Sequence, residues 1–291
     1  MKRATVIGLG QMGSTLARLL LQDGYRVAVW NRNAAKAEPL VALGAVAATS
    51  ALEAVAAGDI VVVCVLDYAA AREILRQDGI AAALEGKLLL QLGTGGVQEA
   101  RDDEAWAREQ GAAYLDGAIQ AAPDYMGKPD TPILLSGSQA TYRAHEGFLR
   151  VFGGGLSYLG EDAGAANAMD MATLSYIYGT ALGFMHGVRI AETEGFSAAQ
   201  YGALVAEIAP SFAGFLKYEA EVIESGDFAI AQSPLRISVE ATERIARAAR
   251  ERGINDEIPA FAAKLFQRAA DAGYADEEIA AFIKILRAPA A

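Results

Sequence analysis

The chain contains few of the residues from which proteins build covalent cross-links or metal centres. It has one cysteine and two histidines among 291 residues. A single cysteine cannot form an internal disulfide, and so few nitrogen and sulfur ligands make a zinc site hard to assemble. Cys64 lies inside the apolar run 60–65, so we interpret it as a buried strand residue rather than a reactive thiol. We therefore expect neither a disulfide framework nor a metal.

Basic charge is scarce as well. The 25 lysines and arginines are outnumbered by 36 aspartates and glutamates, which leaves a formal net charge of -11. No broad basic face is then available for nucleic acid or for an acidic membrane surface, and we expect a small-molecule partner instead. The first residues enter a strand-like segment directly and show no signal-peptide pattern, so we expect a cytoplasmic protein.

A glycine-rich turn near the start organises the first half of the chain. A strand-like segment ending at Ile7 leads into glycines at positions 8, 10 and 13, and an amphipathic helical pattern follows. Gly8 permits a tight turn, Gly10 lets the backbone approach a pyrophosphate, and Gly13 lets the helix pack closely on the strand. The phosphates would bind at the positive end of that helix. This combination predicts a Rossmann-type βαβ unit that binds a dinucleotide.

Strand and helix signals alternate over the first ~160 residues, as they do in a doubly wound sheet. Further strands are expected at 25–30, 60–66, 87–92, 113–119, 132–136 and 156–159, and helices at 34–43, 51–57, 68–75, 80–84, 97–110 and 141–151. From residue 163 to Arg287 the patterns are helical. We predict an α/β fold with a Rossmann-type cofactor domain at 1–161, a long interdomain helix at 162–194 and an all-α dimerisation and substrate domain at 195–291.

The segment from Ala163 to Glu194 contains no proline and is long enough for one helix of roughly 45 to 50 Å. Between Met171 and Val188 it has no formally charged side chain, which is a property of membrane spans. Polar residues spread around the helix and the absence of basic flanks argue against a span. A helix that is apolar nearly all round has to be covered on several sides. We predict that a second subunit covers it, in an intertwined homodimer with active sites at the subunit interface.

The residues after the second expected strand distinguish NADH from NADPH. NAD enzymes usually place an acidic residue there for the adenosine ribose, whereas a 2′-phosphate requires a cation. Here Asn31 occupies the acidic position, Arg32 follows it, and Lys36 lies on the first turn of the next helix. Arg32 can stack on adenine and grip the phosphate, and Lys36 adds a point charge. These residues predict NADPH; a solvated loop with incidental basic residues is the alternative.

With these motifs the sequence resembles the β-hydroxyacid dehydrogenase superfamily and, within it, the imine reductases and reductive aminases. The resemblance covers nearly the whole chain and implies a 6-phosphogluconate dehydrogenase-like C-terminal domain. Besides the glycine turn, it rests on residues 30–32, 64–68, 92–95, 116–119, Pro123, 126–127, 253–254, Pro259, 272–274 and 285–287. The cofactor-binding residues that it implies are Gly8, Leu9, Gly10, Gln11, Met12, Gly13, Asn31, Arg32, Lys36, Val65, Leu66 and Thr94.

The start of the long helix separates the branches of this superfamily. Hydroxyacid dehydrogenases carry a catalytic lysine four residues after the glycine, where this chain has Ala168, and residues 129–216 contain no lysine. Imine reductases place an aspartate or a tyrosine about where Asp170 lies. Reductive aminases add a tyrosine, matched by Tyr178, and an asparagine where this chain has Thr94. The resemblance thus implies an imine reductase of the aspartate type and leaves reductive amination open.

Asp170 suits the reduction of a C=N bond. Hydride attack on the carbon is fast only when the nitrogen is protonated or hydrogen-bonded to an acid. Asp170 stands alone at the start of an apolar helix, with the nearest carboxylates at Asp162 and Glu192. Burial would raise its pKa and favour a protonated donor, whereas an ionised Asp170 would stabilise an iminium cation. Both states stay open, as does a role that only offsets the helix dipole.

The remaining pocket residues are harder to assign from sequence. Tyr178 lies about 80° round the helix from Asp170 and roughly 12 Å along it, so it could contact the far end of one bound complex or simply pack. Phe212 and Phe215 either wall an apolar pocket or belong to the core. His186 is interpreted as structural. The predicted substrate pocket comprises Thr94, Ala121, Asp170, Leu174, Tyr178, Phe212 and Phe215.

The sequence therefore predicts an NADPH-dependent reduction of imines, cyclic imines above all, with Asp170 and Tyr178 as catalytic residues. Hydride would pass to the C=N carbon while Asp170 donates a proton to nitrogen or stabilises the iminium. Two alternatives stay open. One is a β-hydroxyacid dehydrogenase with altered catalytic residues, and the other is a non-catalytic NADPH-binding protein.

Overall fold

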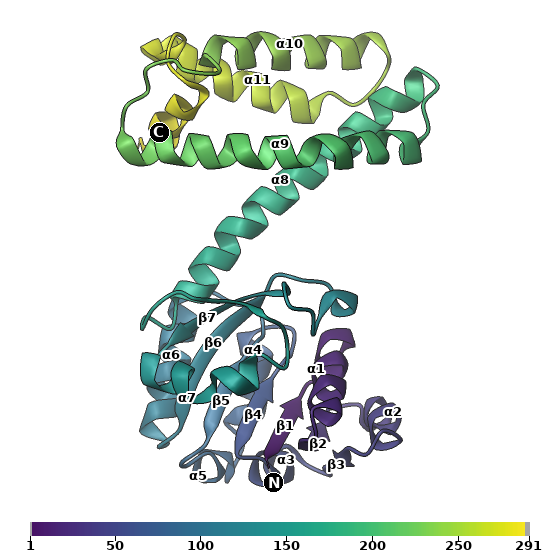
Figure 1. Cartoon of the computed structure of the whole chain (residues 1–291), viewed down its shortest axis with the longest axis vertical. Helices are drawn as coiled ribbons and strands as arrows, with labels where there is room; N and C mark the ends of the chain where they lie inside the picture. Colours follow the sequence, from purple (N-terminus) through teal and green to yellow (C-terminus); the bar gives the residue numbers. More distant parts are fainter. Residues whose placement is uncertain (1, 289–291) are drawn as a thin grey trace. The chain divides into compact units, whose positions relative to one another are not determined.

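The computed structural model describes residues 2–288 and divides into two compact units between Ser175 and Tyr176. The predicted cofactor domain at 1–161 and helical domain at 195–291 extend to Met1 and to residues 289–291, which lie outside the described residues. The colours of Figure 1 run from purple to teal in the first unit and from teal through green to yellow in the second. All strands of the described chain belong to the first unit.

The first unit is built on an eight-stranded sheet of order β3-β2-β1-β4-β5-β6-β7-β8. The strands are β1 (Arg3–Ile7), β2 (Arg26–Trp30), β3 (Val46–Ala47), β4 (Ile60–Val63), β5 (Leu88–Gln91), β6 (Ala113–Ile119), β7 (Pro132–Gly137) and β8 (Gly155–Tyr158). Neighbouring strands are parallel except β6 and β7, which are antiparallel. The chain order reverses beside β1, and in such sheets ligands bind at the carboxyl ends of the strands next to this switch point.

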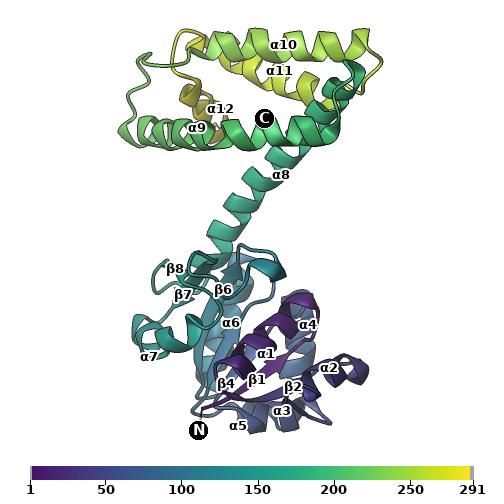
Figure 2. The same cartoon turned by 45° about the vertical axis from the view of Figure 1, so that its right-hand side comes forward.

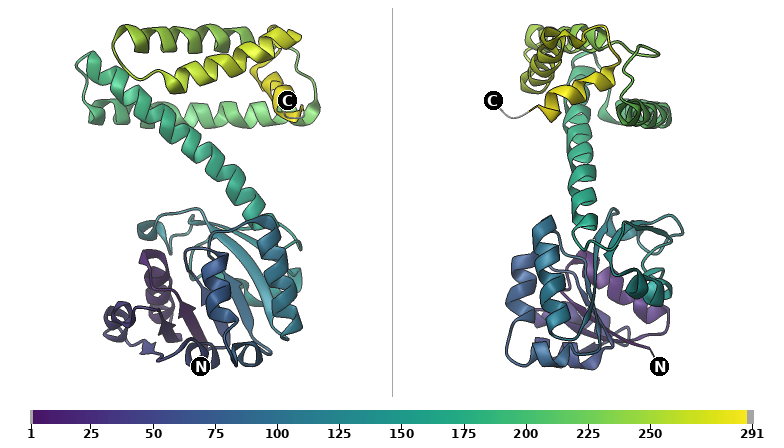
Figure 3. Two further views of the ribbon diagram at one scale, coloured as in Figure 1. Left: turned by 180° about the vertical axis from the view of Figure 1, so that it is seen from behind. Right: turned by 90° about the vertical axis from the view of Figure 1, so that its left-hand side faces the viewer.

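Helices cover both faces of this sheet, which confirms the predicted doubly wound α/β fold (Figures 2 and 3). One core lies under α1 (Gln11–Gln22), α2 (Glu38–Val41) and α7 (Gln139–Leu149). The opposite core lies under α3 (Ala51–Ala57), α4 (Tyr68–Leu75), α5 (Ile80–Ala83) and α6 (Val97–Glu109). Leu16 and Leu20 show why α1 packs here: their spacing puts both on one helical face, and both are fully buried.

The structure differs from the predicted elements in two places, a helix that is divided and a strand that was not predicted. The expected helix at 34–43 is a 3-10 turn, η1 (Ala34–Ala37), followed by the short α2, because Pro39 lacks an N–H and occupies the first turn of the second piece. Strand β3 was not expected, since two exposed residues at a sheet edge are too short to show a periodic pattern.

One long helix, α8 (Ala165–Thr193), passes from the first unit into the second. Its start is fixed by Asp162, whose carboxylate accepts the N–H of Gly164 at 3.0 Å. The hydrogen bonds that Arg101 donates lower the pKa of Asp162 to about 2, so the anion persists at the positive end of the helix. None of the helices formed by residues 2–288 has the length and apolar character that a membrane crossing requires.

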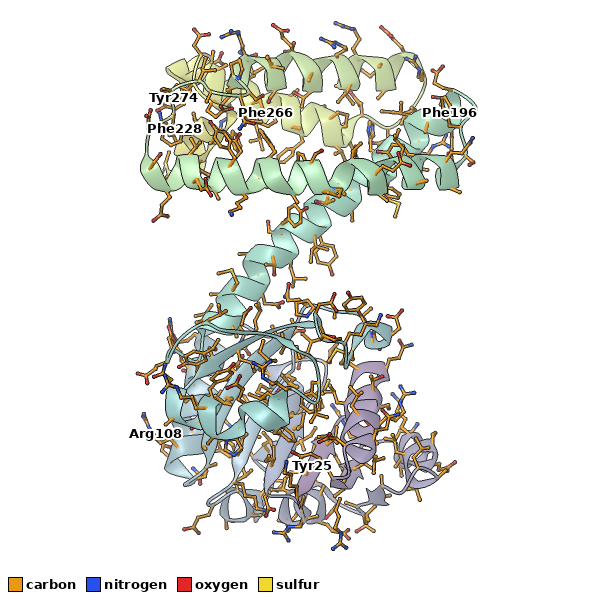
Figure 4. All side chains as sticks on the ribbon, viewed as in Figure 1. Tyr25, Arg108, Phe196, Phe228, Phe266 and Tyr274 are labelled. Atoms are coloured by element: carbon orange, nitrogen blue, oxygen red, sulfur yellow. The ribbon has the colours of Figure 1, made fainter. Side chains whose placement is uncertain are left out.

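The second unit continues with the helices α9 (Ala198–Ser225), α10 (Leu235–Glu251), α11 (Glu257–Ala269) and α12 (Ile283–Arg287) and with the short helical segments η3 (Ala270–Tyr274) and η4 (Ile279–Phe282). The short helical turn η2 (Pro123–Tyr125) lies in the first unit, between β6 and β7. Helices α10 and α11 lie side by side (Figures 1 and 2). In Figure 4 the aromatic rings of Phe228, Phe266 and Tyr274 gather at one end of this unit. The ammonium of Lys284 lies 4.3 Å from the ring centre of Phe228 and 4.6 Å from that of Tyr274. These two cation–π contacts stabilise the packing at this end of the unit.

Candidate active site

The glycine turn between β1 and α1 has the shape that a pyrophosphate requires. Gly8 has a φ of +93°, and a Cβ at Gly13 would lie only 1.9 Å from the carbonyl oxygen of Gly8, so both positions exclude a side chain. A Cβ at Gly10 would meet no described atom within 4 Å, so this residue faces open space. Helix α1 begins there with no side-chain cap among the described residues and no acidic residue in its first turn. Its first N–H groups and the positive end of its dipole therefore fit a phosphate.

Asn31 braces this turn from the end of β2. Its side-chain oxygen accepts the backbone N–H of Leu9 at 3.0 Å, and its side-chain nitrogen donates to the carbonyl of Asn33 at 3.1 Å. Both ends of the carboxamide are thus engaged within the protein. Asn31 ties the second strand to the glycine turn, a supporting role that its position in the sequence did not reveal.

Arg32 and Lys36 are exposed beyond the same strand, where a 2′-phosphate could reach them. Arg32 lies 3.5 Å from the carboxylate of Glu73, and both side chains are about two-thirds exposed, so this ion pair is weak and a phosphate dianion can compete for the guanidinium. Lys36 and Arg18 line a cavity of about 920 Å³ that also touches Gly10 and Gln11 of the glycine turn. The geometry of this edge is therefore suited to NADPH.

Asp170 lies at a second cavity, of about 280 Å³, at the carboxyl edge of the sheet. The walls come from the ends of β4, β5 and β6 and from the starts of α1 and α8, and they are mostly apolar. Asp170 itself is only 7% exposed. The other lining residues are Met12, Cys64, Val65, Leu92, Gly93, Thr94, Ala118, Ile119 and Leu174. Asp170 is the one carboxyl group among them.

Burial raises the pKa of the Asp170 carboxyl, and the side-chain amide of Gln120, which donates to Asp170 Oδ1, partly offsets this increase. Burial also raises the pKa of the Cys64 thiol to about 11, so this neighbour is neutral. The site thus holds one weak acid in a mostly apolar cavity. The raised pKa favours the protonated form of this group, which is the form that can donate a proton.

A buried polar network anchors the first turn of α8 behind this cavity. Asp116 on β6 is fully buried and accepts hydrogen bonds from the hydroxyls of Tyr68 and Tyr114 and from the side-chain amide of Asn167. Asn167 also donates to the hydroxyl of Tyr68 at 2.8 Å. Three elements of the first unit, β6, α4 and α8, are joined here, three residues before Asp170. The position of Asp170 therefore depends on this network.

The network and Gln120 were not predicted as parts of the site. A signal was present in the sequence, because Asp116 interrupts the otherwise apolar strand at 113–119 and Asn167 lies in an alanine-rich helix start. Buried polar groups of this kind almost always have partners. The identity of those partners depends on how the strands are ordered, which local patterns do not show.

The predicted substrate pocket is only partly assembled within the first unit. Thr94, Asp170 and Leu174 line the same cavity, whereas Ala121 packs against the sheet core instead. Tyr178, Phe212 and Phe215 belong to the second unit; Phe212 and Phe215 stack with ring centres 5.9 Å apart. Tyr178 is 66% exposed and Phe212 51% exposed, so neither is a core residue in the single chain. Their roles in substrate binding stay predictions.

The glycine turn, the basic edge after β2 and the largely buried acid together define a class, the dinucleotide-dependent oxidoreductases. Residues 3–160 match the model of the NAD binding domain of 6-phosphogluconate dehydrogenase, and residues 162–288 match that of the NADPH-dependent reductive aminase-like C-terminal domain. The chain is 32% identical to an NADPH-dependent reductive aminase of Aspergillus oryzae, over 98% of this chain and 97% of that protein. The chain belongs to the family of NADPH-dependent imine reductases and reductive aminases.

Solved structures agree with this assignment. The imine reductase from Myxococcus stipitatus in complex with NADP+ is 36% identical, with a TM-score of 0.92 over 99% of this chain and 100% of that chain. The reductive aminase from Aspergillus terreus in complex with NADPH4, cyclohexanone and allyl amine is 36% identical, with a TM-score of 0.91 over 98% of this chain and 99% of that chain. These findings confirm the predicted family, the NADPH cofactor and an oxidoreductase activity on C=N bonds.

Proposed function

We propose that this chain reduces cyclic imines to amines at the Asp170 cavity, with Asp170 as the acid. The observation that carries this proposal is the placement of one largely buried carboxyl group in a mostly apolar cavity at the carboxyl edge of the sheet. The turn from Gly8 to Gly13 would hold the pyrophosphate of NADPH, and Arg32 and Lys36 would hold its 2′-phosphate. When bound, NADPH supplies a hydride from its nicotinamide.

Asp170 has two tasks in this reaction. Its protonated carboxyl donates to the imine nitrogen, which gives an iminium cation, and the resulting carboxylate stabilises this cation at close range. Hydride addition at the carbon then gives the amine, and solvent restores the proton of Asp170. Burial, which raises the pKa of Asp170, supports its protonated state as the starting form.

The cavity favours an imine that arrives already formed. Its lining is mostly apolar, and Thr94 stands where reductive aminases carry an asparagine, which removes one amide that could orient a separate amine and ketone. An imine reductase from Aspergillus terreus has been solved with dibenz[c,e]azepine, a cyclic imine, and a reductive aminase of that species has been solved with cyclohexanone and allyl amine. We therefore propose cyclic imines as the main substrates and reductive amination as the weaker activity.

The test follows NADPH absorbance with the purified chain. Addition of 2-methylpyrroline should lead to the oxidation of NADPH. A panel of β-hydroxyacids should not reduce NADP+ to NADPH. Ala168 stands at the position of the catalytic lysine in hydroxyacid dehydrogenases, so this chain lacks the lysine that would act on a hydroxyacid. Turnover of hydroxyacids without turnover of the imine would overturn the proposal. NADPH binding without either reaction would indicate the non-catalytic alternative.

We further propose that two copies of the chain form a homodimer through the second unit. Several large apolar side chains of α8 and α9 are about half exposed or more in the single chain: Tyr176, Ile177, Leu182, Met185, Leu204, Ile208 and Phe212. An apolar surface of this extent on long helices is typical of a subunit interface. Active sites at that interface stay a prediction.

A further inference from the structure

Gln120 makes a contact that joins two rigid elements of the first unit. It follows β6 directly, and its backbone N–H donates to the carbonyl of Pro132 at 3.1 Å, which ties residue 120 to the start of β7. Its side-chain amide donates to Oδ1 of Asp170, on the second turn of α8. The amide and the acid are 50 residues apart in sequence. Their meeting is therefore a product of the fold.

The other groups that line the Asp170 cavity make no such contact in the part of the chain that the structure describes. Met12 comes from α1, Cys64 from the end of β4, Leu92 and Thr94 from the end of β5, and Ala118 from β6. Of these only Cys64 is titratable, and its buried thiol is neutral. The nearest other acid on β6, Asp116, is fully engaged with Tyr68, Tyr114 and Asn167. Within residues 2–288, Gln120 is the one side chain that hydrogen-bonds to the Asp170 carboxyl.

The direction of this hydrogen bond determines which oxygen of Asp170 can carry the proton. The carbonyl oxygen of a carboxylic acid is a stronger hydrogen-bond acceptor than its hydroxyl oxygen, so the donor at Oδ1 favours the form of the acid in which Oδ1 is the carbonyl oxygen. The proton of the acid is therefore directed to Oδ2. The same donor stabilises the carboxylate more than the acid, so it limits the increase that burial causes in the pKa of Asp170.

We propose that Gln120 is a positioning residue for the proton transfer: it holds Oδ1 of Asp170, so that Oδ2 is the atom that exchanges its proton with the substrate nitrogen. This role rests on the proposed function of Asp170 as the acid. Gln120 touches neither the cofactor nor the substrate in this scheme. It acts through Asp170, by fixing its orientation and the pH range in which it releases a proton.

The test compares pH profiles of kcat with a saturating cyclic imine and NADPH for the wild type, Gln120→Met and Gln120→Glu. Methionine keeps the length of the side chain without the donor, so kcat should fall about 10-fold or more. The alkaline limb, where Asp170 loses its proton, should move to higher pH by about 0.5 to 1, because the carboxylate has lost its donor. Glutamate should move this limb further, since a second negative charge opposes ionisation of Asp170.

Gln267→Met is a matched control, because Gln267 also donates its side-chain amide to an aspartate, Asp271, at 2.7 Å on an exposed surface of α11 and η3. It should leave kcat and its pH profile unchanged. NADPH affinity, measured by fluorescence titration, should be equal in all four proteins. A Gln120→Met profile that superimposes on that of the wild type would overturn the inference; if this variant does not fold, the nearly isosteric Gln120→Glu decides by the same criterion.

Asp170→Asn separates a failure of this inference from a failure of the proposed function. If Asp170→Asn turns over like the wild type, the acid itself has been assigned wrongly. If Asp170→Asn is inactive while Gln120→Met keeps the wild-type profile, Asp170 is the acid and Gln120 is only structural. The inference requires an inactive Asp170→Asn together with a displaced limb in the Gln120 variants.

Discussion

The chemistry of Asp170 depends on residues that are distant from it in sequence. Its neighbours along α8 are apolar, which predicts a raised pKa but offers no partner. The fold supplies Gln120 at one oxygen and encloses the carboxyl between three strand ends. A lone acid of the sequence thus becomes an oriented acid in the structure.

Replacing Asp170 by asparagine should abolish proton donation and keep the side-chain volume. We expect kcat with 2-methylpyrroline to fall by ~10²-fold or more, because general acid catalysis contributes at least this much. NADPH affinity should not change, since Asp170 lies outside the glycine turn. Asp271→Asn, which alters an exposed aspartate that also binds a glutamine amide, serves as the control. Steady-state kinetics that match the wild type would remove Asp170 from the mechanism.

The buried carboxyl group of Asp116 leads to a prediction about stability rather than about activity. Burial raises the pKa of Asp116 in the folded protein to about 7, although the hydrogen bonds from Tyr68, Tyr114 and Asn167 lower it. An exposed aspartate has a pKa of about 3.9. Between these values the folded protein keeps a proton that the unfolded chain has lost. The stability from this group is therefore fully present below about pH 4 and is lost as the pH rises through about 7.

We expect the free energy of unfolding of the wild type to decline over this window, relative to that of Asp116→Asn, by on the order of a few kcal/mol. Groups shared by the two proteins cancel in the difference, which isolates Asp116. Urea unfolding at several pH values between about 5 and 8 measures it. A constant difference across this range would show that Asp116 keeps one protonation state.

At the scale of elements, the turn between β1 and α1 separates a structural glycine from a binding glycine. Gly13→Ala places a Cβ 1.9 Å from the carbonyl oxygen of Gly8, so it should lower Tm and NADPH affinity together. Gly10→Ala meets no described atom within 4 Å, so Tm without cofactor should stay close to that of the wild type while NADPH affinity falls at least ~10-fold. Thermal melts and fluorescence titration distinguish the two. Equal effects of both substitutions on Tm would contradict this division.

Elements with clear start and stop signals were predicted to within a few residues. The predicted strand at 113–119 is β6, and the predicted helices at 51–57 and 68–75 are α3 and α4. The latter two helices begin after Ser50 and Asp67, whose side chains cap them by accepting backbone N–H groups. The two-residue β3 and the antiparallel pairing of β6 with β7 were not predicted, because neither is encoded in a local period.

At the scale of the whole molecule, the exposed apolar side chains of the second unit predict association. We expect light scattering at micromolar concentration to give about twice the chain mass of 30.5 kDa. Leu204→Glu, at a residue that is 55% exposed on α9, should shift the protein toward monomer because it buries a charge in the interface. Val46→Glu, at the 62% exposed edge strand β3, is the matched control. A monomeric wild type would contradict the proposed dimer.

The sequence by itself determined the class of fold, the cofactor and the family. These conclusions depend on local spacing: the alternation of strand and helix, the three glycines, the basic pair after β2 and the alanine at position 168. Each is visible within a few neighbouring residues, and the physical requirement behind each, such as a turn without side chains, acts at the same short range.

Only the tertiary structure decided how the site is held together. Asn31 meets Leu9 across 22 residues, Gln120 meets Asp170 across 50, and Asn167 meets Tyr68 across 99. These pairs form because strand order brings the carboxyl ends of β1, β2, β4, β5 and β6 to one edge of the sheet. Buried polar groups then require partners there, and which partners they find is set by topology rather than by sequence distance.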